Sequence, residues 1–223
     1  MDNKIEVLNI KINLCTAKEA MKKAVDYLKS DLISVIEFVT PNSIMALDEK
    51  DELKSQMDQF ELILAGEKAL FDVLGVKDEN LVKEVEERRF LKLFFQYLHK
   101  QYKRVYLLVE AEKDAENIYE HFSKSYRGIE IVGIAKVAAA NRADMMLVNA
   151  INGSEVDCII STLSTPLQED FVTKNKNLMN ARVWLGLGKK MLDFEEEETA
   201  KRKLAKYLMK KILKKEIEKQ KRS

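Results

Sequence analysis

Residues able to bind a ligand follow several apolar runs of strand length in this chain. They are Thr40, Asn42, Gln168, Glu169, Gly186 and Gly188. The amide of Asn42 could reach a ligand hydroxyl or cap the next helix, and both roles stay open. Pro166, with Thr165 as the expected cap, opens a helix whose first N–H groups could meet an anion, although the carboxylate of Glu169 competes for that field. The two glycines permit either close approach to a ligand or a tight exit from a strand.

The run FELILAGEKAL raises the question of a catalytic base. Its apolar part stops at Ala65-Gly66, and the carboxylate of Glu67 comes one residue later. A base must lie within about 3 Å of the hydroxyl that it deprotonates, and a helical residue one step along points about 100° away. Glu67 is therefore the candidate catalytic residue only if the turn is rebuilt around it.

Apolar runs of strand length alternate with segments of helical period along most of the chain. We predict strands over 5–12, 32–40, 61–65, 104–109, 129–134, 157–162 and 182–187, with the first as an edge ribbon. We predict helices over 16–30, 43–58, 67–74, 80–100, 112–126, 139–152 and 166–179. This alternation predicts an α/β protein with a Rossmann-like, doubly wound and mostly parallel sheet, in which ligands bind beyond the carboxyl ends of the strands.

Composition narrows the class of protein. A chain of 223 residues with 46% hydrophobic residues can bury one large core, which we place in a single domain over 1–194. Cys15 and Cys158 are lone cysteines and no apolar leader follows Met1, so we expect a cytoplasmic location. No metal-ligand spacing, Walker loop or G-x-G-x-x-G is present, and we expect no metal and no cofactor.

The last part of the chain, 195–223, differs in charge from the rest. Residues 199–223 hold eleven Lys or Arg against two Glu, a net charge of +9 that leaves −8 for the first 198 residues. Apolar residues along one face predict a basic amphipathic helix. It could bind an anionic membrane surface, at the inner face of the plasma membrane, or an acidic protein, including the body of its own or a neighbouring chain. No aromatic or basic platform accompanies it, so we expect no nucleic acid.

Taken together, these segments resemble the WecG/TagA/CpsF glycosyltransferases. The matching pieces span about residues 5 to 190 in family order: VLNIKINLCTAKEAM, FVTPNSIMAL, FELILAGE, GIEIVG, STPLQEDFVTKNK and VWLGLG. The resemblance implies substrate-binding roles for the T-x-N residues Thr40 and Asn42, for the Q-E pair Gln168 and Glu169, and for the final glycines Gly186 and Gly188.

The resemblance also implies an activity. Members of the family move an N-acetylhexosamine from a UDP donor to a polyprenyl-diphosphate-linked sugar at the cytoplasmic membrane face, in cell-surface polysaccharide or teichoic-acid-type assembly. They use no metal, and a carboxylate is the expected base. Such a protein would require a UDP-sugar as its donor and no further cofactor.

Three departures from the family pattern concern the chemistry. Gly66 stands where the family has its Asp, EVEERR replaces T-G-x-D, and Glu110 and Glu112 replace a Gly-Gly loop suited to a diphosphate. We therefore predict that catalysis is lost or reduced. Two alternatives stay open: an active transferase that uses Glu67 as its base, and a non-catalytic partner or regulator that forms a homo-oligomer or a hetero-oligomer with an active transferase.

Overall fold

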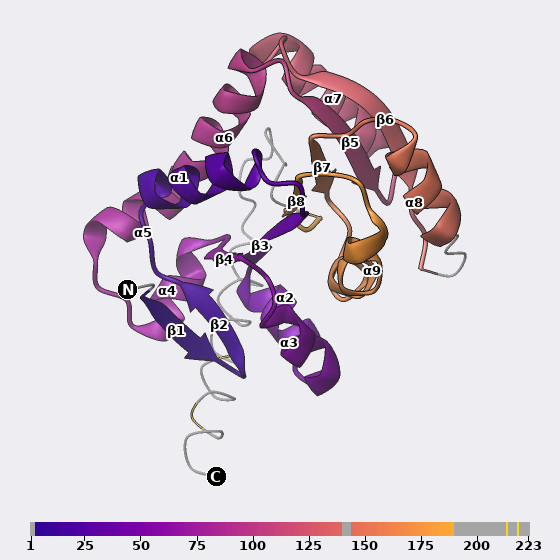
Figure 1. Cartoon of the computed structure of the whole chain (residues 1–223). Coiled ribbons are helices and arrows are strands. Elements are labelled where there is room, and N and C mark those ends of the chain that lie inside the picture. Colours follow the sequence, from indigo (N-terminus) through magenta and orange to yellow (C-terminus); the bar gives the residue numbers. More distant parts are fainter. Residues whose placement is uncertain (1–2, 140–143, 190–212, 214–217, 219–223) are drawn as a thin grey trace.

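A computed structural model describes residues 3–139, 144–189, 213 and 218. Its centre is a sheet of six strands, all parallel, in the order β4-β3-β8-β7-β5-β6 (Figure 1). The strands are β3 (Ser34–Val39), β4 (Leu62–Ala65), β5 (Arg104–Val109), β6 (Glu130–Lys136), β7 (Cys158–Ser161) and β8 (Val183–Gly186). Every residue of β3, β4, β7 and β8 is buried, as expected for parallel strands that are covered on both faces. The predicted sheet is confirmed.

The helices lie close to their predicted positions. They are α1 (Ala17–Tyr27), α2 (Pro41–Ala46), α3 (Asp51–Met57), α4 (Lys68–Leu74), α5 (Glu79–Glu86), α6 (Arg89–Lys100), α7 (Glu112–Ser125), α8 (Asp144–Asn152), α9 (Leu167–Asn175) and the short η1 (Lys176–Leu178). At the start of α1, the side chain of Thr16 accepts from the Glu19 N–H while the Glu19 carboxylate accepts from the Thr16 N–H. This is the reciprocal cap that T-x-x-E predicts.

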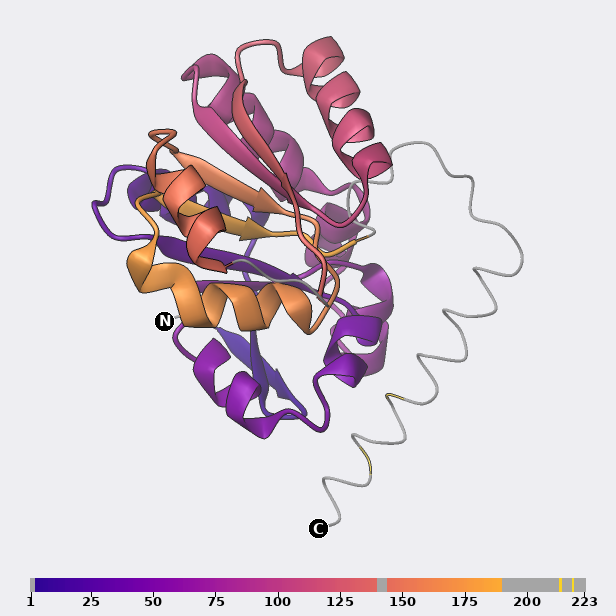
Figure 2. The same cartoon turned by 90° about the vertical axis from the view of Figure 1, so that its right-hand side faces the viewer.

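Two apolar clusters cover the two faces of the sheet. Buried residues of α1, α6 and α7 pack on one face, and those of α2, α3, α8 and α9 pack on the other. Figure 2 shows α7 on one side of the strands and α9 on the other. The sheet is therefore doubly wound. The loops that carry the candidate residues follow the strands at its carboxyl edge.

The first predicted strand is wrong in detail. Residues 5–12 form no single edge strand but two antiparallel strands, β1 (Lys4–Val7) and β2 (Ile10–Asn13), in a separate sheet. Leu8 and Asn9 join them with φ of 46° and 66°, the left-handed backbone of a two-residue hairpin turn. The ribbon attaches to the main sheet where the Ile63 N–H donates to Asn13 Oδ1 at 2.9 Å.

Two predicted helices are each split in two. The segment 43–58 forms α2 and α3, and the segment 80–100 forms α5 and α6 with a break at Arg88. Arg88 has φ of 51°, and a left-handed residue interrupts the helical hydrogen-bond ladder. The predicted core half of the long helix is α6, which buries Phe90, Leu91, Phe94, Phe95 and Leu98.

The predicted basic helix and the 195–223 appendage lie outside the described residues, except for Leu213 and Glu218. Leu213 is helical and fully buried in the same apolar cluster as the β1-β2 ribbon, and Glu218 is exposed. Within the described part of the chain, no helix combines the length and the apolar character needed to cross a bilayer.

Candidate functional site

The candidate residues lie at the carboxyl edge of the sheet, where β3, β8 and β7 are neighbours. Strand pairing sets Glu37 opposite Gly186, and Gly186 opposite Ser161. The turns that follow these strands carry Thr40, Gly188 and the start of α9. Because parallel strands end at one edge, residues more than 100 positions apart in the chain meet here.

Thr40 caps α2, and Asn42 does not. The Ser43 N–H donates to Thr40 Oγ1 at 3.2 Å, and the Thr40 N–H donates to Ser43 Oγ at 2.8 Å. Asn42, at the second position of the helix, is exposed. The capping alternative for Asn42 is therefore wrong, because the preceding Thr40 and Pro41 already form the helix start.

Gln168 and Glu169 lie in the first turn of α9 and are fully buried. Gln168 Nε2 donates to Glu37 Oε1, and the Gly188 N–H donates to Gln168 Oε1 at 3.3 Å. Each end of the amide therefore has a partner inside the protein. The predicted helix start is shifted: α9 begins at Leu167, Pro166 occupies the cap position, and Thr165 Oγ1 donates to Glu169 Oε1 at 2.8 Å instead of capping the backbone.

Sequence reasoning missed Glu37, which is fully buried in the middle of β3. Its signal was a single acid inside the apolar run LISVIEFVT, since acids are almost never fully buried unless they are paired. Its partner strand carries Gly186 opposite, where an added Cβ would overlap Glu37 Oε2. The close approach at Gly186 is therefore made by the Glu37 carboxylate, and a ligand-binding role of Gly186 stays a prediction.

Glu37 and Glu169 form a buried carboxyl pair. Burial, and then the charge of Glu169, raise the pKa of Glu37 well above its usual value, against the hydrogen bond from Gln168. Burial raises the pKa of Glu169 to about 7, against the hydrogen bond from Thr165. The Oε2 atom of each has no hydrogen-bond partner among the described residues. Since two unshielded charges are costly in such a site, the pair retains a proton near neutral pH.

We expect this pair to make the protein less stable as the pH rises. The folded pKa of Glu169, about 7, lies above its ordinary value of 4.5, so its stabilising contribution is complete below pH 4.5 and is lost as the pH rises through 7. The free energy of unfolding should fall by about 2 kcal/mol between pH 5 and pH 8 from this group.

Urea unfolding at both pH values checks this expectation, with Glu169→Gln as the matched control. Glutamine keeps an acceptor for Thr165 and cannot ionise. Between pH 5 and pH 8, the free energy of unfolding of the variant should therefore fall less than that of the wild type. A difference that does not change with pH would contradict the assignment.

A second polar cluster lies at the ends of β5 and β8. Ser164 Oγ donates to Glu110 Oε1 at 2.7 Å, and Lys189 Nζ pairs with Glu110 Oε2 at 3.0 Å. Burial alone would raise the pKa of Glu110, but the contacts from Ser164 and Lys189 outweigh it and lower the pKa. Glu110 is therefore ionised at neutral pH. The second replacement acid, Glu112, is exposed and pairs with Lys136 at 3.9 Å, so solvent screens its charge.

Gly66, where the family pattern has its acid, lines a largely apolar cavity under α1, α5 and α6. The Gly66 N–H donates to the Val39 carbonyl at 2.8 Å, which holds this turn against β3. Glu67 is the cap residue of α4 in extended backbone, and it is absent from the described lining. Gln168, Glu169, Gly186 and Gly188 are also absent from that lining, so the cavity at Gly66 and the cluster at Glu37 are separate parts of the edge.

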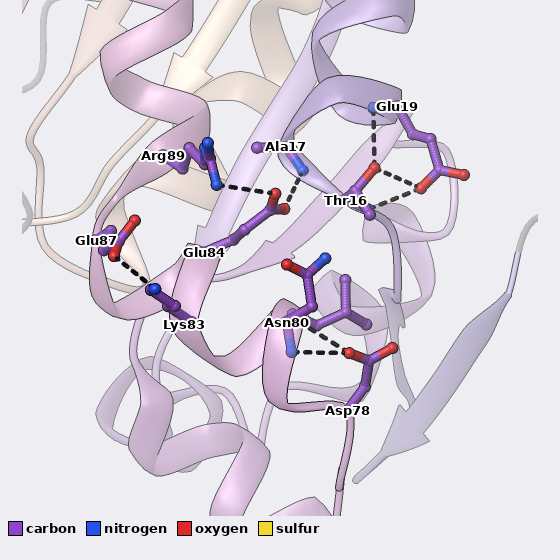
Figure 3. A network of polar contacts seen from close by, with 10 residues as sticks. Thr16, Ala17, Glu19, Asp78, Asn80, Lys83, Glu84, Glu87 and Arg89 are labelled. Atoms are coloured by element: carbon purple, nitrogen blue, oxygen red, sulfur yellow. Dashed lines mark hydrogen bonds and ion pairs between the residues drawn. The ribbon is translucent and has the colours of Figure 1, made fainter.

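The carboxylate that does line this cavity is Glu84, on α5. Glu84 Oε2 accepts from the Ala17 N–H at 2.7 Å, and Glu84 Oε1 pairs with Arg89 at 3.8 Å (Figure 3). The segment EVEERR thus lines the same cavity as Gly66, the position of the missing acid. The carboxylate of Glu84 in this segment holds the start of α1. Within the described part of the chain, no three His, Cys, Asp or Glu side chains lie close enough to hold a metal ion.

Ligands of doubly wound sheets bind beyond the carboxyl ends of the strands, and both polar clusters and the cavity lie there. Fold and site together define an α/β protein with a doubly wound parallel sheet and two polar clusters at its carboxyl edge. Within that class, the chain belongs to the WecG/TagA/CpsF glycosyl transferase family, whose model matches residues 5–201 of the 223. The resemblance found in the sequence motifs is confirmed. No curated protein matches the chain.

Proposed function

We propose that this protein is a WecG/TagA/CpsF-type glycosyltransferase-like protein of cell-surface polysaccharide or teichoic-acid-type assembly in which sugar transfer is lost or reduced. The reaction in question moves an N-acetylhexosamine from UDP to a polyprenyl-diphosphate-linked acceptor. One observation carries the proposal: the turn after β4 presents Gly66, without a side chain, to the cavity where a base would be needed. A positioned general base contributes about 10²- to 10⁴-fold to such a rate.

Neither nearby carboxylate is placed to replace that base. Glu67 starts α4 and does not line the cavity. Glu84 lines it, but the Ala17 N–H and Arg89 engage its two oxygens. Both oxygens of Glu84 therefore already have partners inside the protein, which leaves the carboxylate poorly placed to reach an acceptor hydroxyl.

The donor side of the edge supports the same proposal. A UDP-sugar brings a diphosphate, and a diphosphate is held by cations and free N–H groups. Lys189 already pairs with the ionised Glu110, and the Gly188 N–H already donates to Gln168. An incoming diphosphate would have to displace these internal partners and would meet the charge of Glu110.

A transfer assay with UDP-N-acetylhexosamine and a polyprenyl-diphosphate-linked acceptor tests the proposal. The wild type should form product at least about 10²-fold more slowly than an active transferase of the family, the share of rate that a base supplies. Glu67→Gln should leave this low rate unchanged. If the wild type transfers at a normal rate and Glu67→Gln abolishes transfer, the protein is the active transferase with Glu67 as its base.

The basic segment 199–223 fits a role as a partner or regulator of an active transferase, in a homo-oligomer or a hetero-oligomer at the inner face of the plasma membrane. Its charge of +9 suits an anionic membrane surface or an acidic protein. The burial of Leu213 in an apolar cluster of the protein supports docking on protein.

We expect deletion of residues 199–223 to move the protein from membrane or partner fractions into the free fraction. Flotation with anionic vesicles and size-exclusion chromatography measure the two outcomes. A full-length variant with lysines 210, 211, 214 and 215 changed to glutamine keeps Leu213 and serves as the control, since it removes charge without removing the buried residue. Unchanged behaviour of both variants would rule out this role for the segment.

A further inference from the structure

We propose that Glu37 is a positioning residue of the candidate site: it holds the amide of Gln168 and, through it, the turn at Gly188. The proposal deepens the proposed function, because it concerns the same edge of the sheet and rests on that edge being the ligand site. The contacts themselves do not depend on whether transfer occurs.

The position of Glu37 is costly for a carboxyl group. All six residues of β3 are buried, and Glu37 itself is 0% exposed between its register neighbours Ile63 and Gly186. Strand alternation puts it on the same face as Val35 and Val39, which are core residues. An apolar side chain would satisfy the packing there, whereas a buried carboxyl needs hydrogen bonds to be tolerated. Gln168 Nε2 supplies such a hydrogen bond to Glu37 Oε1.

The partners of Gln168 decide which way its amide points. A backbone N–H can only donate, so Oε1 of Gln168 must face the Gly188 N–H, and Nε2 then faces Glu37 Oε1, which accepts. If an apolar residue replaced Glu37, the buried Nε2 would lose this acceptor. The amide could then rotate, and the Gly188 N–H would lose its defined acceptor.

The turn at Gly188 connects the Gln168 amide with the second polar cluster, at Glu110 and Lys189. Gly188 has φ of 66°, and the next residue, Lys189, pairs with Glu110. Glu110 accepts from Ser164 Oγ, and the Ser164 carbonyl accepts from the Gln168 N–H at 3.1 Å. These contacts close a ring that joins the turn after β8, the end of β5 and α9. Glu37 lies outside the ring, in the core of the sheet, and holds it through the bond from Gln168.

Gly186 completes the arrangement by leaving space. Any Cβ at this position would overlap the Glu37 carboxylate. The two residues are therefore a matched pair on adjacent strands, an acid and the glycine that accommodates it. Shortening residue 37 should make a side chain at 186 tolerable.

Amide hydrogen exchange of Gly188 in the full-length protein tests the proposal. In Glu37→Leu, the Gly188 N–H should exchange about tenfold faster, the loss expected when one hydrogen bond of this kind is released. Glu37→Gln retains an oxygen acceptor for Gln168 and should restore slow exchange. The Gly128 N–H, which donates to His99 Nδ1 at 2.7 Å, is the reference amide that corrects for a change in global stability.

Two outcomes would overturn the proposal. One is exchange at Gly188 that follows the reference amide in Glu37→Leu, because Glu37 then does not hold the turn. The other is exchange in Glu37→Gln as fast as in Glu37→Leu, because an acceptor at this place then does not suffice.

A double-mutant cycle keeps the proposal testable if Glu37→Leu does not fold. Gly186→Ala should lower the urea midpoint of the wild type and lower it by less than half as much in the Glu37→Ala background. Equal losses in both backgrounds would contradict the matched pair. Neither measurement uses transfer as its readout, so an active wild-type enzyme would refute the proposed function while leaving this inference intact.

Discussion

Gly66→Asp is expected to raise sugar transfer by about 10²-fold over the wild type, the lower end of what a positioned base supplies. The turn after β4 reaches the cavity at this residue, and its backbone bond to the Val39 carbonyl does not involve a side chain. Among the described glycines, only Gly75 and Gly188 have positive φ, so no left-handed backbone at Gly66 disfavours an L-residue. Product formation from a radiolabelled UDP-N-acetylhexosamine measures the gain.

Gly66→Asn is the matched control for this gain, since it has nearly the same size and no basic carboxylate. It should stay at the wild-type rate. Glu84→Gln, tested in the wild-type background, shows whether the acid that lines the cavity supplies any residual rate. Equal rates for the Asp and Asn variants would show that a missing base is not what limits transfer.

Glu110→Gln is expected to strengthen the binding of UDP by about tenfold, because it removes a like charge beside the diphosphate and releases Lys189 from its internal ion pair. Glutamine can still accept from Ser164, so the contact at 2.7 Å between the two loops is retained. The gain should shrink at high salt, since the Lys189 side chain is 55% exposed. Calorimetric titration of the variant and the wild type measures the difference.

Two further variants test the cause of that gain. Glu112→Gln removes an exposed acid and should change UDP binding little. Glu110→Gln combined with Lys189→Gln should lose the gain. A double variant that binds as tightly as Glu110→Gln alone would mean that Lys189 does not meet the diphosphate.

The strands of the main sheet could be predicted because parallel strands buried on both faces are continuous apolar runs. The turn inside the predicted ribbon was missed because Leu8 and Asn9 take left-handed backbone without a glycine to signal it. The break at Arg88 was missed for the same reason: the segment EVEERRF keeps a helical pattern, and no Gly or Pro marks the end of α5.

The candidate site could be predicted only in part. Motifs placed Gln168, Glu169, Gly186 and Gly188 at strand ends, and the structure brings them together at one edge. Their partners depend on pairing between distant strands: Glu37 meets Gly186 and Gln168 across 149 and 131 positions of the chain. Sequence spacing alone carries no information on such contacts. The ion pair of Glu110 with Lys189 was missed likewise, because it joins residues 79 positions apart in the chain.

The central claim is that this member of the family has lost the groups that bind the UDP-sugar donor. Calorimetric titration of the full-length wild-type protein with UDP tests it most directly. We expect no saturable binding below about 1 mM, because internal partners occupy Lys189 and the Gly188 N–H and Glu110 remains ionised. A micromolar dissociation constant would contradict this, since it would require an intact diphosphate site at the edge of the sheet.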